Sequence, residues 1–131
     1  PTTTGAAIAT TQTIPSLEDK FDGMAVRVPT PVGSLCDISF LLGKKATTDD
    51  INAAFRKAAQ SARLKNILAV TDEPLVSSDY VGNPASAIVD LSLTKVVDGD
   101  LAKVVAWYDN EWGYSQRMAD MAEYVMKKKL V

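Results

Sequence analysis

A short segment near the N-terminus carries residue types that can hold an anion. Thr3 and Thr4 stand before an Ala- and Thr-rich run, Gly5 to Thr13, which predicts a short helix that ends before Pro15. The free N–H groups at the start of such a helix can bind an anion, because the helix dipole favours negative charge there. A threonine hydroxyl can instead cap the same N–H groups. Spacing alone leaves both interpretations open.

Nucleophilic chemistry is limited by what the sequence contains. Cys36 is the only cysteine and the chain has no histidine, which excludes Cys–His and Ser–His pairs and histidine metal sites within these residues. No metal site is predicted. Cys36 falls on the apolar face of an alternating pattern, which favours a small buried hydrophobe. A reactive thiol would need nearby positive charge, and the sequence neighbours supply none.

Composition points to one soluble domain. The 131 residues are 47% hydrophobic, and 14 Lys and Arg against 16 Asp and Glu give a net charge of −2, which does not suit nucleic-acid binding. No apolar run approaches the roughly 20 residues that span a bilayer, and no signal-peptide pattern is present. A single cysteine also fits a reducing compartment. The expected location is the cytoplasm, with no membrane partner.

Two longer helices are predicted. Residues 47–50, Thr-Thr-Asp-Asp, form a helix start with a capping hydroxyl and acidic side chains near the positive end of the dipole. Asn52 and Arg56 are expected on the solvated side of this helix, opposite an apolar stripe that includes Phe55. A last helix is predicted over residues 113–130. Its apolar stripe, expected in the core, comprises Tyr114, Met118, Met121, Ala122 and Val125.

Alternating apolar residues predict several strands, over residues 24–28, 36–42, 67–70, 87–93 and 101–108. Asp98-Gly99 between the last two predicts a tight hairpin turn. Strands and helices do not alternate regularly, so the predicted class is α+β: a mixed, largely antiparallel sheet with helices packed on one face. No Gly-x-Gly-x-x-Gly follows a strand, so a dinucleotide-binding fold is not expected within the chain.

Two nine-residue segments resemble signature stretches of the glyceraldehyde-3-phosphate dehydrogenases. They are residues 23–31, Gly-Met-Ala-Val-Arg-Val-Pro-Thr-Pro, and residues 107–115, Trp-Tyr-Asp-Asn-Glu-Trp-Gly-Tyr-Ser. Residues 2–7 and 76–79 are similar to two further family segments. The resemblance covers essentially the whole chain and implies a partial C-terminal catalytic domain over residues 1–131. It also implies that the N-terminal Rossmann domain is absent and that Pro1 is an internal start.

The resemblance implies a glycolytic or gluconeogenic enzyme that oxidises an aldehyde phosphate with NAD, or NADP, and inorganic phosphate. In the family a cysteine attacks the aldehyde, a histidine acts as base, hydride passes to the nicotinamide, and phosphate cleaves the thioester. The family's Ser-Cys-Thr-Thr-Asn segment and its histidine do not occur here, and Cys36 does not replace the nucleophile. No catalytic residue is expected in this chain, which alone should be inactive and bind no cofactor tightly.

Family roles carry over to three phosphate-binding positions. Arg27 resembles the family arginine that binds phosphate near the substrate, and a guanidinium fork suits a phosphate group. Thr4 and Gly5 resemble the pair that lines the inorganic phosphate site, where a hydroxyl and a backbone N–H hold the anion. Without the resemblance, Arg27 is a surface strand residue and Thr4 a helix cap.

Two positions carry over to the cofactor. Asn110 resembles the asparagine that hydrogen-bonds the nicotinamide carboxamide and so fixes which ring face meets the substrate. Tyr114 resembles a tyrosine that packs beside the nicotinamide. The alternatives are a turn residue before the last helix for Asn110 and the first core residue of that helix for Tyr114.

Two other functions fit the same residues. A fragment of erythrose-4-phosphate dehydrogenase would have the same architecture, and a non-catalytic folded or interaction fragment would need neither cysteine nor histidine chemistry. The partners that the resemblance implies are a sugar-phosphate substrate, inorganic phosphate, the N-terminal portion of the same enzyme, and further copies in a tetramer.

Overall fold

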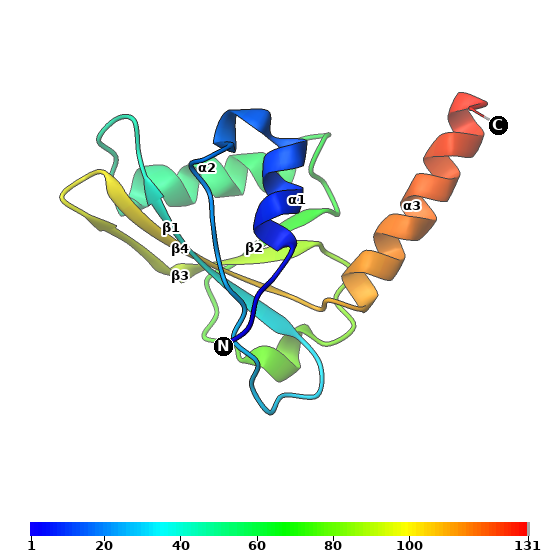
Figure 1. Ribbon diagram of the computed structural model, residues 1–131, viewed down its shortest axis with the longest axis horizontal. Helices are drawn as coiled ribbons and strands as arrows, with labels where there is room; N and C mark the ends of the chain where they lie inside the picture. Colours follow the sequence, from blue (N-terminus) through cyan, green and yellow to red (C-terminus); the bar gives the residue numbers. More distant parts are fainter. Residues whose placement is uncertain (131) are drawn as a thin grey trace. The chain divides into compact units, whose positions relative to one another are not determined.

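The computed structural model describes residues 1–130 and divides the chain into two compact units, residues 1–31 and residues 32 onward (Figure 1). The first unit holds helix α1 (Ala6–Thr13) and the short 3₁₀ helix η1 (Pro15–Leu17). Thr2 and Ala25 form an isolated antiparallel bridge with N···O distances of 2.8 and 3.0 Å. This bridge joins the two ends of the unit.

The strand predicted over residues 24–28 is wrong. Among the described residues, this segment pairs only at Ala25, with Thr2. Its apolar side chains Met24, Val26 and Val28 are all exposed. Alternation alone does not make a strand, because a strand needs a ladder partner for its backbone N–H and C=O groups.

The second unit is built on a four-stranded sheet: β1 (Ser34–Leu41), β2 (Leu68–Thr71), β3 (Ala87–Val97) and β4 (Leu101–Tyr108). Their order across the sheet is β1-β4-β3-β2. The β1–β4 and β3–β4 pairs are antiparallel, and the β2–β3 pair is parallel. This confirms the predicted α+β class with a mixed, largely antiparallel sheet.

The predicted hairpin turn joins β3 to β4. Asp98 and Gly99 both have positive φ, at 49° and 77°, as a two-residue turn of this kind requires. Lys45 braces the turn, because its Nζ lies 3.0 Å from the Asp100 carboxylate and 3.4 Å from that of Asp98. A Cβ added at Gly99 would lie 2.8 Å from Cδ of Lys45. Glycine at this position therefore serves both the turn and the lysine.

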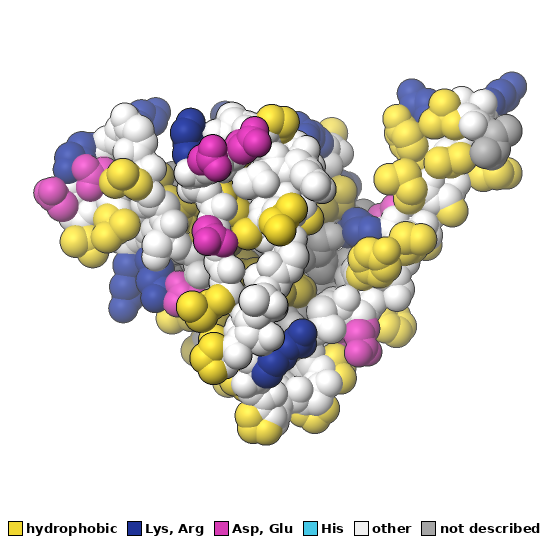
Figure 2. All heavy atoms as spheres, in the orientation of Figure 1, with side chains coloured by type: hydrophobic (Ala, Val, Ile, Leu, Met, Phe, Trp, Pro, Cys, Tyr) yellow, Lys and Arg dark blue, Asp and Glu magenta, His cyan; other side chains and the backbone are white. Residues whose placement is uncertain are grey.

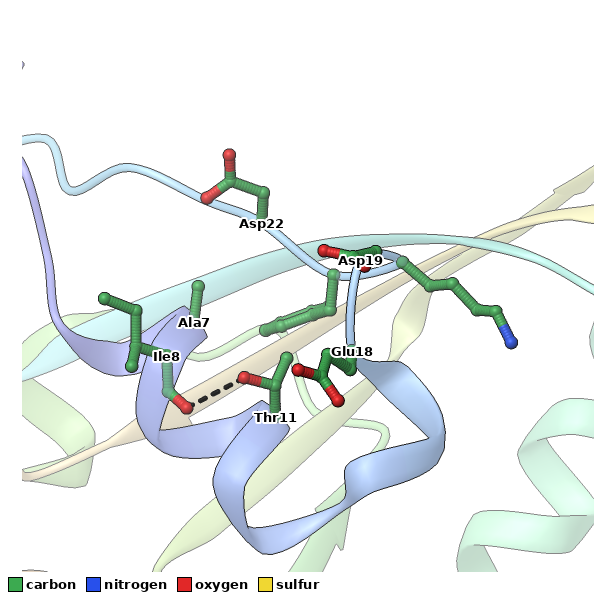
Figure 3. Close-up of a pocket in the computed structure, with 8 residues that line it drawn as sticks. Ala7, Ile8, Thr11, Glu18, Asp19 and Asp22 are labelled. Carbon is green, nitrogen blue, oxygen red and sulfur yellow. Dashed lines mark hydrogen bonds between the residues drawn. The ribbon is translucent and has the colours of Figure 1, made fainter.

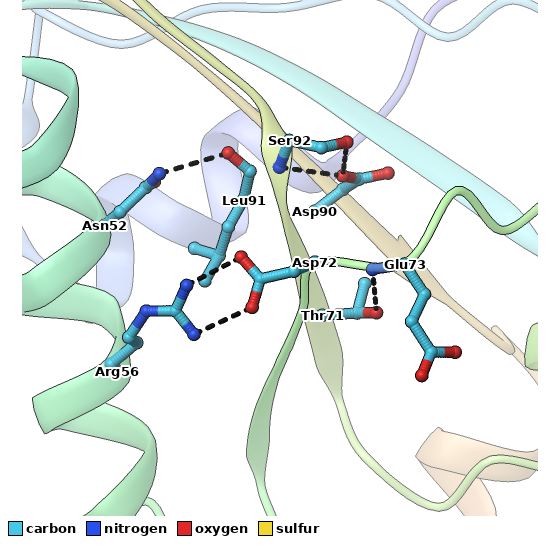
Figure 4. Close-up of polar contacts among 8 residues, drawn as sticks. All are labelled: Asn52, Arg56, Thr71, Asp72, Glu73, Asp90, Leu91 and Ser92. Carbon is cyan, nitrogen blue, oxygen red and sulfur yellow. Dashed lines mark hydrogen bonds and ion pairs between the residues drawn. The ribbon is translucent and has the colours of Figure 1, made fainter.

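Helix α2 (Thr48–Gln60) covers one face of the sheet (Figure 1). Thr47 and Asp50 form the capping box that begins it, close to the predicted start. Arg56 joins it to the carboxylate of Asp72, at the end of β2, with N···O distances of 2.6 and 2.8 Å (Figure 4).

Asn52 departs from its predicted place on the solvated side of α2. Its Nδ2 donates to the carbonyl of Leu91 at 3.1 Å, and the contact is partly buried (Figure 4). A polar side chain beside an apolar stripe can point toward the sheet when a backbone carbonyl lies within hydrogen-bond distance. This arrangement is favourable because a buried carbonyl needs a hydrogen-bond donor.

Each face of the sheet has its own apolar cluster. Under α2, four buried strand residues pack with Ile51 and Phe55; they are Val89, Leu91, Val104 and Ala106. In the cluster on the opposite face, Tyr80 belongs to the 3₁₀ helix η2 (Ser77–Tyr80) and stacks on Trp107. The two ring centroids are 5.2 Å apart. The segment between β2 and β3 thus contains one turn of 3₁₀ helix.

Helix α3 (Trp112–Lys128) follows β4 and carries an exposed apolar stripe. Hydrophobic side chains run along it in Figure 2. Tyr114, Met118 and Met121 are all more than half exposed. The prediction that this stripe belongs to the core is therefore wrong for this chain. Among residues 1–130 no helix combines the length and hydropathy needed to cross a bilayer.

Candidate functional site

The turn between β4 and α3 is built around the carboxylate of Asp109. Its Oδ1 accepts from the backbone N–H groups of Glu111 and Trp112, at 3.0 and 2.8 Å. Its Oδ2 accepts from the N–H of Gly82, at 2.9 Å. Asp109 is 4% exposed, and the bonds from Gly82 and Trp112, with that from Glu111, hold its pKa below the ordinary value. This carboxylate caps the start of α3 and fixes the backbone on both sides of Asn110.

Asn110 itself is exposed at the end of β4. Oδ1 of its side chain accepts a hydrogen bond from Oγ of Ser34, at 3.1 Å. Ser34 is the first residue of β1 and lies directly opposite Tyr108 in the ladder. The two residues of this bond are 76 positions apart in sequence. The sheet register therefore brings a hydroxyl to the Asn110 amide.

Cys36 and Tyr108 lie on the same face of the sheet, because Tyr108 is opposite Ser34 in the β1–β4 ladder and Cys36 is two residues after Ser34. Cys36 is half-buried, in keeping with its predicted place on an apolar strand face. Burial raises the pKa of the Tyr108 phenol, and the neighbouring Cys36 thiol raises it further. Its phenol therefore remains protonated near neutral pH.

Tyr114 lies one turn after Asn110, near the start of α3. Its side chain is 68% exposed, so the alternative that made it the first core residue of the helix is wrong. The ring is available to a ligand, and its predicted position beside a nicotinamide stays a prediction.

The predicted phosphate-binding residues all lie in the first unit. The hydroxyl of Thr4 accepts from the N–H of Ala6 at 3.2 Å, and Gly5 is the N-cap of α1. Arg27 is exposed. The Thr2–Ala25 bridge is antiparallel, so Thr4 and Arg27 lie on opposite sides of the bridging pair. The cap that the sequence allowed is thus present, and a hydroxyl that accepts one bond can still donate another.

The first unit also has an open hollow of about 590 Å³ between α1 and the segment that follows η1 (Figure 3). Its charged lining includes Glu18, Asp19 and Asp22 against one lysine, Lys20. Three carboxylates make it unsuited to a phosphate. The predicted anion-binding residues Thr4, Gly5 and Arg27 do not line it. Within residues 1–130 no group of three or more Cys, Asp or Glu side chains is placed to hold a metal ion.

The family described as "Glyceraldehyde 3-phosphate dehydrogenase, C-terminal domain" matches residues 1–110. The chain belongs to this family. The matched range includes all of residues 23–31, with Arg27, and the first four residues of the second segment, up to Asn110. The sheet with its α2 cover is consistent with this domain.

Curated relatives match nearly all of the chain. A glyceraldehyde-3-phosphate dehydrogenase of Mycobacterium tuberculosis (strain H37Rv) is 55% identical over 127 residues, which are 97% of this chain and 37% of the relative. One from Streptomyces coelicolor is 51% identical over 125 residues, 95% and 37% of the two chains. Glyceraldehyde-3-phosphate dehydrogenase A, chloroplastic, of Chlamydomonas reinhardtii is 52% identical over 128 residues, 98% and 34%. The chain thus spans little more than a third of the length of these relatives.

Two polar residues that lie next to Asn110 were not predicted from the sequence as parts of this candidate site. Asp109 had a usable signal, because an aspartate just before a predicted helix is a common cap. Ser34 had none, since its bond to Asn110 depends on the register between β1 and β4.

Replacing Asp109 by asparagine should lower the free energy of unfolding of this domain by about 1–3 kcal/mol. Both carboxylate oxygens accept from backbone N–H groups, and the amide puts an NH₂ group, which cannot accept, in place of one of them. Because the pKa of Asp109 is lowered in the folded state, its contribution to the free energy of unfolding also depends on pH. The unfolded state binds more protons than the folded state below an ordinary aspartate pKa of about 3.9. The stabilisation is therefore full above that pH and is lost as pH falls through the folded pKa.

Urea denaturation at pH 7 and pH 3 measures both effects. Asp49→Asn, an exposed position in the first turn of α2, serves as control. Equal stability of the Asp109 and Asp49 variants at pH 7 would contradict the assignment of Asp109 as the cap of α3.

Proposed function

We propose that this chain is the C-terminal catalytic part of a phosphorylating glyceraldehyde-3-phosphate dehydrogenase. The observation that carries the proposal is family membership over residues 1–110, together with 51–55% identity to relatives of that name over 95–98% of the chain. The reaction is oxidation of an aldehyde phosphate with NAD or NADP and inorganic phosphate. Because the relatives carry the glyceraldehyde name, erythrose-4-phosphate dehydrogenase is not favoured.

In this proposal the first unit of the chain supplies phosphate contacts. Arg27 binds the substrate phosphate through its guanidinium fork. Thr4 and Gly5 bind inorganic phosphate through a hydroxyl and the N–H groups at the start of α1. The exposure of Arg27 supports this role, as does the eight-residue helix that begins directly after Gly5.

The second unit supplies the cofactor contacts. Asn110 and Tyr114 are both exposed, and an amide and an aromatic ring suit a nicotinamide carboxamide and its ring. When bound, the nicotinamide supplies the acceptor for the hydride. The chain's own part is to bind the carboxamide through Asn110 and so to orient the ring, with Tyr114 packed beside it.

The remaining chemistry belongs elsewhere in the whole protein. A nucleophilic cysteine, a histidine base and a Rossmann domain would come from an N-terminal portion of the same enzyme, since this sequence has no histidine. The whole protein would be a cytoplasmic homo-oligomer, a tetramer as the resemblance implies. No tight binding of NAD or NADP by this chain alone is expected.

Replacing Arg27 by alanine in the intact protein should raise the KM for glyceraldehyde 3-phosphate by roughly tenfold to a hundredfold, because a hydrogen bond to a charged group contributes about 1.5–3 kcal/mol. Steady-state NAD reduction in saturating phosphate measures the change. The matched control is Arg63→Ala, another exposed arginine, which should leave KM unchanged. An intact protein that prefers erythrose 4-phosphate, or needs no phosphate, would overturn the proposed reaction. An unchanged KM in the Arg27 variant would overturn only the residue assignment.

A further inference from the structure

We propose that Ser34 is a positioning residue that orients the side-chain amide of Asn110 and thereby decides which group this chain presents to a nicotinamide. This inference rests on the proposed function. It concerns a residue outside both segments that carry the family resemblance, and it starts from the bond between Oγ of Ser34 and Oδ1 of Asn110, at 3.1 Å.

An asparagine amide has two chemically different ends. The oxygen only accepts hydrogen bonds, and the nitrogen only donates them. Because Oδ1 of Asn110 faces Ser34, Nδ2 is the end left for a ligand. A flipped amide would present an oxygen instead, which repels the carboxamide oxygen of a nicotinamide.

A serine hydroxyl both donates and accepts, so its partner decides which of the two it does here. The partner is Oδ1 of Asn110, which can only accept, so Oγ of Ser34 is the donor in the 3.1 Å contact. The hydroxyl hydrogen of Ser34 is therefore used on Oδ1 of Asn110.

The backbone on both sides of this contact is fixed. Ser34 is held by the β1–β4 ladder. Asn110 follows Asp109, whose carboxylate accepts hydrogen bonds from the backbone N–H groups of residues 82, 111 and 112. With both backbones held, the main freedom left to Asn110 is the rotation of its own side chain. Removal of the Ser34 hydroxyl releases that rotation without disturbing the turn.

The test uses the intact protein with Ser34→Ala, Ser34→Thr, Asn110→Ala and the Ser34→Ala/Asn110→Ala double variant. Direct titration gives the Kd for NAD, and a substrate deuterated at its aldehyde carbon shows which face of the ring receives the deuterium. Ser34→Ala should raise Kd roughly threefold to tenfold, as expected for one neutral hydrogen bond, and should send part of the deuterium to the other face. Ser34→Thr keeps the hydroxyl and should restore both readouts.

The double variant should bind NAD no more weakly than Asn110→Ala alone, because Ser34 acts only through Asn110. Ser39→Ala, an exposed serine on the same strand, controls for general effects on β1. If Asn110→Ala weakens NAD binding while Ser34→Ala changes neither readout, the positioning role is overturned and the proposed function stands. If Asn110→Ala has no effect either, the nicotinamide contact fails and this inference fails with it.

Discussion

The 131-residue chain, purified alone, should reduce no NAD with glyceraldehyde 3-phosphate and inorganic phosphate. It has no histidine to act as base, and its one thiol, Cys36, is half-buried on β1. A nucleophilic thiol needs nearby positive charge to lower its pKa. Tyr108, whose pKa the neighbouring Cys36 raises, is a phenol and supplies no positive charge. The loss of rate relative to the intact enzyme should therefore be complete within detection.

The measurement is the absorbance of reduced cofactor at matched molar concentrations of the chain and of the intact protein. Cys36→Ser distinguishes a genuine but weak activity of this chain from contamination. Turnover by the purified chain that disappears in the Cys36 variant would contradict the assignment of Cys36 as a structural residue. Turnover that persists at the same level would point to contaminating full-length enzyme.

Leu91→Ala should lower the free energy of unfolding by about 2–5 kcal/mol, the usual cost of removing a large buried aliphatic side chain from a core. Leu91 is 3% exposed and belongs to the cluster that packs β3 and β4 against Ile51 and Phe55 of α2. Native domains are stable by only about 5–15 kcal/mol. This one substitution should therefore remove a large part of the stability of the second unit.

Urea denaturation of the chain, followed by far-UV circular dichroism, measures the effect. Leu41→Ala is the matched control, since Leu41 lies in the same sheet but is 83% exposed. It should change the free energy of unfolding by less than about 0.5 kcal/mol. Similar losses in both variants would contradict the placement of the core under α2.

Local sequence signals predicted those parts of the fold that depend on neighbouring residues. The threonine cap of α2, the Asp98-Gly99 turn and the strands of the sheet all appear close to the predicted positions. These features are set by hydrogen bonds and backbone preferences within a few residues. The overall α+β class followed from their order.

Other features depend on residues far apart in sequence, and these the sequence did not reveal. The stretch 24–28 alternates like a strand but pairs only at Ala25. Asn52 was expected in solvent, yet it donates to Leu91 on a neighbouring strand. The apolar stripe of α3 has helical spacing, and its large side chains nevertheless remain exposed. Periodicity identifies an apolar face but not what covers it.

The residues of the candidate site also fall into those that the sequence predicted and those that only the structure shows. Arg27, Asn110 and the Thr4-Gly5 pair came from resemblance to family segments, and family membership over residues 1–110 supports that source. Their roles remain proposals. The contact of Ser34 with Asn110 and the three backbone bonds of Asp109 come from sheet register and loop packing.

A crystal structure of the intact protein with NAD and sulfate tests the central proposal most directly, that this chain supplies a phosphate contact from its first unit and a nicotinamide contact from its second. The expected result is a sulfate on the guanidinium of Arg27 and the nicotinamide carboxamide on Nδ2 of Asn110. Sulfate and nicotinamide bound away from these two residues would contradict it.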